Sequence, residues 1–381
     1  MTYRVLILGA SYGSLFGTKL LMAGQSVALV CTRSTAELIN RDGTVVKFSV
    51  KGRDIDVAST KLPGQLSATT PDGVDPAAFD LVVLGMQEAQ YGSPGVRELM
   101  GRIAKARVPC LAIMNMPPLP YLQRIPEIRT AEVAACYADL GVWQDFDPAL
   151  VTLASPDPQA FRPPDQPKNV LHASPDPQAF RPPDQPKNVL QVGLPTNFKA
   201  ARFAGDEPTA LLRRLEADIE AAQFEGMEIP VKLKVHDSIF VPLAKWPMLI
   251  TGNYRCILAD RMIPIKEAVH GDLQRSRQVY DWVSKLCLGL GADEADLVPF
   301  DKYAKAAEGL GKPSSAARAL FGGAAHIERV DCLVRRIAGQ RGLSFDTLDE
   351  IVALVDQRLA KNRATPTASL PGVRPVPLRP V

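Results

Sequence analysis

Apolar and polar positions alternate in blocks through the first third of the chain. Short apolar runs, typical of strands that are buried on both faces, are separated by stretches of helical period. This pattern predicts strands at residues 3–9, 26–32, 80–85 and 108–114, with helices at 14–23 and 95–106. Alternation of strand and helix is typical of a parallel sheet covered by helices on both faces. We therefore expect an α/β fold that begins with a Rossmann-type, doubly wound sheet at residues 1–205.

Helical periodicity dominates the second half of the chain. A chain of 381 residues exceeds the roughly 250 residues over which a single core usually grows, so a second domain is expected. The segment 237–260 is largely apolar but contains Pro242 and Pro247. We expect an all-helical domain for substrate binding and dimerisation at 206–362, followed by a mobile, proline-rich tail at 363–381. The pattern predicts its helices at residues 211–223, 265–288, 316–337 and 347–361.

The middle of the chain contains a tandem repeat without a single difference between its copies. Residues 154–171 recur at 173–190, and both copies are rich in proline and polar residues. Two such copies cannot bury a solenoid core, which needs at least three units. We interpret them as an in-frame duplication of one surface loop, because a longer exposed loop costs little entropy. A binding insert is the alternative.

Composition excludes several classes of partner. The formal net charge is only +3, without a basic stripe that would indicate nucleic acid binding. No apolar stretch approaches the roughly 20 residues that a membrane-spanning helix needs. The alternative that Arg4 opens a signal peptide is disfavoured by a short apolar run without an A-x-A cleavage site. We expect a soluble, cytoplasmic protein.

Cysteine and histidine give no indication of a metal site. The six cysteines are scattered without a C-x-x-C pair, and the four histidines are equally dispersed. Cysteines in apolar or helical surroundings behave as small hydrophobic residues. We therefore expect reduced core cysteines and no bound metal.

A glycine-containing turn follows the first predicted strand. In Gly9-Ala-Ser-Tyr-Gly13-Ser14, small residues at a strand-to-helix turn let backbone N–H groups approach a pyrophosphate, which also meets the helix N-terminus. The match to G-x-G-x-x-G is imperfect, because Ser11 replaces the second glycine, Ser14 replaces the third and Gly13 comes one position early. We predict a dinucleotide-binding turn. Its candidate cofactor-binding residues are Gly9, Ser11, Tyr12, Gly13 and Ser14.

The residue after the second strand distinguishes two dinucleotides. An acidic residue at this point binds the ribose hydroxyls of NAD, whereas an arginine accommodates the 2′-phosphate of NADP. The strand ends in Thr32-Arg33, which favours NADPH. An ordinary solvated arginine is the alternative for Arg33.

Two polar residues follow later strands of the sheet. Gln87 comes after the strand at 80–85, and Asn115 comes after the strand at 108–114. Ligands of such sheets bind beyond the carboxyl ends of the strands. We expect both side chains where the nicotinamide and a substrate meet.

Together these residues carry a resemblance to a known family. The matching features are Gly13-Ser-Leu-Phe-Gly17, Arg33, Asn115, the segment 243–253 and the pair Ser314-Ser315. The chain resembles the ketopantoate reductase (2-dehydropantoate 2-reductase) family, within the 6-phosphogluconate dehydrogenase-like superfamily. The resemblance covers residues 1–360 and implies hydride transfer from NADPH to a small 2-keto acid, in pantothenate biosynthesis, by a homodimer.

The resemblance also implies roles for individual residues. Lys245 matches the family's general acid, Asn115 and Asn253 match its catalytic asparagines, and Asn253 and Ser315 match substrate-binding positions. Hydride transfer leaves charge on the carbonyl oxygen, so a proton donor and oriented amides lower the barrier. A surface lysine with its stem laid along apolar groups is the alternative for Lys245.

The chain departs from the family pattern at several positions. Gln87 stands where the family has a lysine, Leu249 where it has an asparagine, and Pro247 falls within the helix expected for Lys245. The family's helical glutamate falls on Glu328 or Arg329. Two alternatives to a keto-acid reductase therefore stay open: a non-catalytic NADP-binding protein of the same fold, and an imine or opine-type reductase.

Overall fold

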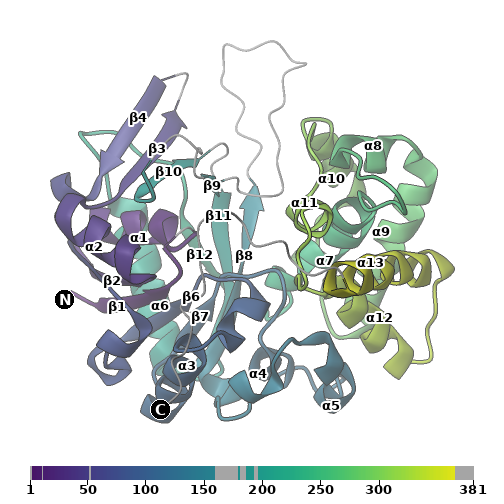
Figure 1. Ribbon diagram of the computed structural model, residues 1–381, viewed down its shortest axis with the longest axis horizontal. Coiled ribbons are helices and arrows are strands. Elements are labelled where there is room, and N and C mark those ends of the chain that lie inside the picture. The colour runs from purple at the N-terminus through teal and green to yellow at the C-terminus, as the bar shows by residue number, and fades with distance from the viewer. Residues whose placement is uncertain are drawn as a thin grey trace, which may run out of the picture.

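The computed structural model describes residues 2–10, 12–50, 53–158, 179–180, 186–192 and 196–364. Figure 1 shows a large sheet with its flanking helices on one side and a cluster of helices, α7 to α13, on the other. Most of the duplicated segment, the tail from residue 365 and Ser11 lie outside the described residues. The predictions made for them stay predictions.

The large sheet has the strand order β12-β11-β8-β7-β6-β1-β2-β5. Its pairs are parallel, except that β11 runs antiparallel to β8. β2 and β6 flank β1 on opposite sides, which makes the end of β1 the topological switch point where ligands of this fold bind. The doubly wound sheet is confirmed. Its strands are β1 (Arg4–Leu8), β2 (Ser26–Val30), β5 (Gln65–Thr69), β6 (Leu81–Leu84), β7 (Cys110–Ala112), β8 (Val151–Pro158), β11 (Thr196–Ala201) and β12 (Leu233–His236).

Helices cover both faces of this sheet because its central strands are apolar at every position. Along β1, Val5 and Ile7 join one core with α1 and α6, while Leu6 and Leu8 join the other core with α3. The sheet continues to β12, beyond residue 205, where the composition suggested that the first domain ends. The helices on this side of the molecule are α1 (Tyr12–Met22), α2 (Arg33–Asp42), α3 (Val96–Ala106), α4 (Leu119–Leu122), α5 (Thr130–Val133) and α6 (Asp206–Ala221).

A second, smaller sheet has the order β4-β3-β10-β9 and was not predicted. It joins a hairpin inserted after α2 to the end of the second repeat copy, because Val189 and Leu190 pair with Val45 and Val46. The first copy instead begins inside β8. The two copies thus enter different sheets. The strands are β3 (Val45–Val50), β4 (Arg53–Ala58), β9 (Ala179–Phe180) and β10 (Val189–Val192).

Two of the predicted C-terminal helices are each divided into two. The prediction of one helix at 265–288 is wrong because Asp272 caps a new helix, accepting the Arg275 N–H at 2.8 Å. The prediction at 316–337 is also wrong: Gly323 has a φ of +89°, which ends the helix and releases a segment at 322–329. The helices are α8 (Ile265–His270), α9 (Leu273–Gly289), α10 (Phe300–Ala307), α11 (Ser315–Phe321), α12 (Val330–Gln340) and α13 (Asp346–Ala364).

The largely apolar segment before α8 forms one compound helix. A 3₁₀ turn at Val241–Ala244 runs into α7 (Lys245–Met248), which continues as a π-helical turn at Leu249–Tyr254. Pro247 lies in the first turn of α7, where a missing N–H costs no helical hydrogen bond. Other 3₁₀ turns lie at Ser59–Lys61, Pro71–Gly73, Pro76–Ala78, Glu88–Gly92, Ala134–Cys136, Leu140–Val142, Pro148–Leu150 and Glu294–Asp296.

Among the described residues, no helix combines the length and the apolar character needed to cross a lipid bilayer.

Candidate functional site

The turn after β1 is built against the turn after β6. Gly9 has a φ of +100°, and a Cβ atom there would lie 2.7 Å from Cγ of Met86. Only glycine fits this conformation and this contact. The Gly9 N–H bonds to the carbonyl of Val30 at 3.1 Å, which ties the turn to β2 as well. Three strand ends therefore meet at the predicted dinucleotide turn.

Gly13 explains the irregular spacing of the glycine motif. A Cβ atom at Gly13 would lie 2.5 Å from Cγ2 of Ile7 on β1, so Gly13 allows the close helix-to-strand packing that the motif's third glycine provides. Ser14, in the third slot, is buried and its hydroxyl donates to the carbonyl of Ala10. Ser11 and the side chain of Tyr12 lie outside the described residues.

Arg33 lies at the same edge of the sheet. It is the first residue of α2, directly after β2, and its side chain is exposed. A cation there can reach an anion bound beyond the strand ends. Exposure is equally compatible with a solvated arginine.

Gln87 and Asn115 occupy the next two strand ends. The turn after β6 is fixed by the Tyr91 hydroxyl, which accepts the Met86 N–H at 3.0 Å, while the Gln87 side chain is exposed. Asn115 follows β7 and is partly buried. Its amide contacts the carboxyl group of Glu328.

Lys245 is a buried residue. It begins α7 and is only 7% exposed, so the interpretation as a lysine on the surface is wrong. Its charge acts on Glu328, the residue that contacts Asn115, so Lys245 lies within electrostatic range of that carboxyl group. A buried ammonium next to a carboxyl and an amide is typical of a functional site.

Asn253 lies on the π-helical turn that follows Lys245. It is 5% exposed, and its Oδ1 atom is enclosed without a hydrogen-bond partner among the described residues. The hydroxyl of Ser314 donates to the Asn253 carbonyl at 2.6 Å and caps α11 by accepting the Ala317 N–H. Ser315, the predicted substrate serine, is the first residue of α11 and is partly exposed. Ser314 thus has a structural role that links α11 to the site.

Glu328 is the residue that the sequence left undecided. Its neighbour Arg329 instead pairs with Asp331 at 2.9 Å and with Asp356 at 2.6 Å. The carboxyl group of Glu328 is approached by the Asn115 amide and by the N–H groups of Glu88 and Met116, yet its Oε1 is enclosed without a well-formed hydrogen bond. Burial dominates over these contacts and over the charge of Lys245, and it raises the pKa of Glu328 to about 7.

The segment that delivers Glu328 is anchored by the helix that carries Lys245. The Tyr254 hydroxyl donates to the Glu328 carbonyl and accepts the Val330 N–H at 3.0 Å. One compound helix therefore holds Lys245 and Asn253 and fixes the position of Glu328. In the sequence, the pair Gly322-Gly323 is the feature that indicates the end of α11, so the segment that carries Glu328 lies outside that helix.

Replacing Glu328 by glutamine is expected to change how stability depends on pH. The folded-state pKa is raised, so the folded protein loses stability as pH rises from the ordinary value of 4.5 to about 7. Glu328→Gln removes this loss and should be more stable than the wild type above pH 7 by about 2–3 kcal/mol, with a smaller difference near pH 5.

Urea denaturation across this pH range measures the effect. Glu127→Gln, at an exposed position, is the control and should follow the wild type. Parallel pH profiles for Glu328→Gln and the wild type would show that Glu328 ionises in the folded protein as it does in water.

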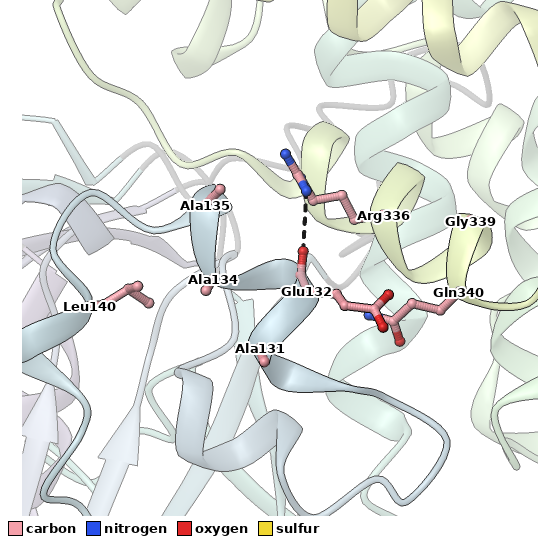
Figure 2. Close-up of a pocket in the computed structure, with 8 residues that line it drawn as sticks. All are labelled: Ala131, Glu132, Ala134, Ala135, Leu140, Arg336, Gly339 and Gln340. Atoms are coloured by element: carbon pink, nitrogen blue, oxygen red, sulfur yellow. Dashed lines mark hydrogen bonds between the residues drawn. The ribbon is translucent and has the colours of Figure 1, made fainter.

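A separate pocket lies between α5 and α12 and has a volume of about 670 Å³ (Figure 2). None of the predicted site residues lines it. Its lining residues are Ala131, Glu132, Ala134, Ala135, Leu140, Arg336, Gly339 and Gln340. The described residues also contain no group of three or more histidine, cysteine, aspartate or glutamate side chains that could hold a metal ion.

Comparison with known proteins gives matches to solved structures. No family model matches the sequence, and no curated protein matches it significantly. The 2-dehydropantoate 2-reductase from Methylococcus capsulatus has a TM-score of 0.62 at 13% identity, covering 95% of this chain and 98% of the other. A ketopantoate reductase from Ralstonia eutropha has a TM-score of 0.58 at 16% identity, covering 94% and 99%.

A third solved structure carries ligands. The ternary structure of D-mandelate dehydrogenase with NADH and anilino(oxo)acetate has a TM-score of 0.60 at 13% identity, covering 95% of this chain and 100% of the other. A structural match at such low sequence identity shows that the backbones of the two proteins are arranged alike. Over nearly its whole length, the chain has the fold of these ketopantoate reductases and of D-mandelate dehydrogenase.

Proposed function

We propose that this protein is an NADPH-dependent reductase of a small 2-keto acid, with Lys245 as the general acid. The observation that carries the proposal is that buried Lys245 acts on Glu328, which contacts Asn115 beyond the carboxyl end of β7. The turn after β6 touches the glycine turn of β1. A reducing nucleotide held by that turn would have this cluster beside it.

The residues around the glycine turn fit a dinucleotide. Gly9 and Gly13 let the turn and α1 pack closely against Met86 and Ile7 at the switch point, and α1 would present its N-terminus to a pyrophosphate. Arg33 would hold the 2′-phosphate, and Gln87 and Asn115 would lie near the nicotinamide. When bound, NADPH would supply the hydride.

The remaining residues would handle the substrate and the proton. Lys245 would donate a proton to the carbonyl oxygen as negative charge develops there. Asn115 and Asn253 would orient the substrate through their amides, and Ser315 would bind it. Glu328 contacts Asn115 and attracts the Lys245 ammonium, so it would position both groups.

The solved neighbours and the departures of this chain from the family pattern support the proposed substrate class. Those neighbours include ketopantoate reductases and a dehydrogenase bound to an oxoacetate. Leu249 is buried where the family has an asparagine, and Gln87 is exposed where it has a lysine. We favour a 2-keto acid that is less polar than ketopantoate. By the same resemblance, we propose a cytoplasmic homodimer that associates through its helical half.

Replacing Arg33 by alanine is expected to weaken the binding of NADPH but not that of NADH. Loss of one charge-assisted contact to the 2′-phosphate should raise the Kd of NADPH about 10–100-fold and leave NADH nearly unchanged. Fluorescence titration with both nucleotides measures this. Arg41→Ala, in the same helix but ion-paired with Asp42, is the matched control. If the wild type bound NADPH and NADH with equal affinity, Arg33 would be a solvated residue that makes no contact with the 2′-phosphate.

A substrate panel tests the proposed function. NADPH oxidation should be measured with linear, branched and aromatic 2-keto acids and with ketopantoate, each with and without ammonia or an amine. We expect turnover with at least one keto acid in the absence of ammonia or an amine. Turnover only with an amine would favour an imine or opine-type reductase. NADPH binding without any turnover would favour the non-catalytic alternative.

A further inference from the structure

We propose that Cys136 and Cys332 form a reversible disulfide that joins the sheet domain to the helical domain, with a hydroperoxide as the oxidant. Cys136 ends the 3₁₀ turn at Ala134–Cys136, and Cys332 lies in the first turn of α12. The 3₁₀ turn that carries Cys136 packs against α12, and the two thiols are near enough to act on each other's pKa. This site is separate from the candidate active site and does not depend on the proposed reaction.

The surrounding contacts keep the two cysteines together. We call residues 129–136 and the facing helix α12 (Val330–Gln340) the interdomain seam. The Gln340 side chain accepts the Arg129 N–H and donates to the Arg129 carbonyl, both at 2.9 Å. Arg336 donates to the Glu132 carbonyl at 3.2 Å, as Figure 2 shows. These contacts hold the two backbone segments together while the sulfur atoms approach to the bond length of about 2.0 Å.

The electrostatic surroundings favour a thiolate on one side of the pair. The hydrogen bond from Cys136 lowers the pKa of Cys332, and the guanidinium of Arg336 and the charge of Arg329 act in the same direction. Burial and the neighbouring Asp331 oppose them. The thiolate is the reactive form of cysteine, so Cys332 would be the attacking residue and Cys136 the resolving one.

A pocket lies next to the two cysteines, through which we propose that a small oxidant approaches. Cys136 and Cys332 are 5% and 8% exposed, which excludes large reagents. The open pocket at the seam is lined by Ala134 and Ala135, directly before Cys136, and on the other side by Arg336, which contacts Cys332 (Figure 2). Hydrogen peroxide that enters this pocket would meet Arg336, whose guanidinium interacts with Cys332.

The reaction balances with hydrogen peroxide alone. The Cys332 thiolate attacks one peroxide oxygen, an S–O bond forms, the O–O bond breaks, and the departing hydroxide takes up a proton to give water. The Cys136 sulfur then attacks Cys332, the S–S bond forms, the S–O bond breaks, and the hydroxyl leaves as a second water with the Cys136 proton. Two thiols are oxidised and one peroxide is reduced to two waters.

The disulfide would affect the candidate site through the chain. Cys332 lies four residues after Glu328, in the first turn of α12, so a bond to Cys136 would fix the start of α12 and the segment that delivers Glu328. If the proposed function holds, we expect reversible loss of turnover on oxidation, since closing and opening of the two domains would be restricted.

Peptide mapping of the full-length protein tests the proposal. The native protein is treated with hydrogen peroxide, denatured, alkylated and digested, with and without reduction by dithiothreitol. We expect the oxidised wild type to lose two thiols and to yield a peptide that joins Cys136 to Cys332, released by reduction. In Cys136→Ser, dimedone present during the denaturation step should instead trap a sulfenic acid on Cys332.

Other cysteines provide the control. Burial raises the pKa of Cys256 to about 11 and that of Cys287 to about 12, so Cys287→Ser should form the bond like the wild type. Oxidation confined to Cys31, or unchanged thiol content in the folded wild type, would overturn the proposal even if a variant failed to fold. Because the mapping needs no turnover, its outcome is independent of the proposed function.

Discussion

Replacing Lys245 by alanine is expected to lower kcat for keto-acid reduction by about 10²–10⁴-fold, the usual contribution of a general acid. Lys245 is buried beside Glu328 and Asn115, so no exposed cation can take its place. NADPH binding should change little, because the glycine turn and Arg33 lie on other elements. Steady-state kinetics and nucleotide titration measure the two effects separately.

A matched variant and a stability measurement make this result interpretable. Lys61→Ala removes an exposed lysine and should leave kcat unchanged. Removing Lys245 also leaves Glu328 without its cationic neighbour, so thermal unfolding of Lys245→Ala should be compared near pH 5 and pH 8. Unaltered turnover by a folded Lys245→Ala protein would remove Lys245 from the proposed chemistry.

Replacing Asn253 by leucine is expected to cost activity while it increases stability. The Oδ1 atom of Asn253 is enclosed without a partner, and such a group lowers folding stability by about 1–3 kcal/mol. A substrate that hydrogen-bonds to this amide would account for the presence of an unpartnered polar group at this buried position. We expect Asn253→Leu to unfold at higher urea concentration and to lose about 100-fold in kcat/KM.

Thr251 offers a matched control for this variant. Its hydroxyl oxygen, on the same π-helical turn, is also buried without a hydrogen-bond partner among the described residues. Thr251→Val should therefore increase stability without loss of turnover. If Asn253→Leu keeps the wild-type kcat/KM, or if both variants lose activity equally, then Asn253 has no specific contact with substrate.

The part of the chain that forms the large sheet was predictable at its start because the signals there are local. The apolar run of β1, the glycine turn and α1 follow one another along the sequence, and each restricts the next. The sequence showed that Gly13 comes one position early in the glycine motif, but it did not show why a glycine is needed there. Contact with Ile7 depends on how α1 lies on the sheet, which no pattern in the motif reveals.

The candidate site around Lys245 was predictable only in part, because it depends on contacts between residues that are far apart in the sequence. Lys245 and Asn253 were found through a resemblance, whereas the choice between Glu328 and Arg329 stayed open because one helix was predicted over 316–337. Its position is set by Tyr254, far away in the chain, and by strand ends of the other domain. The contact between Cys136 and Cys332 is equally nonlocal, and two separated cysteines give no sign of it.

Deuterium transfer is the most direct test of the central claim. NADPH deuterated at C4 of the nicotinamide, on the face used by the protein, is incubated with the purified chain and a 2-keto acid. We predict that the product is the 2-hydroxy acid with deuterium at its C2 carbon. A protein that binds NADPH but returns every keto acid of the panel unlabelled and unreduced would contradict the proposed reaction.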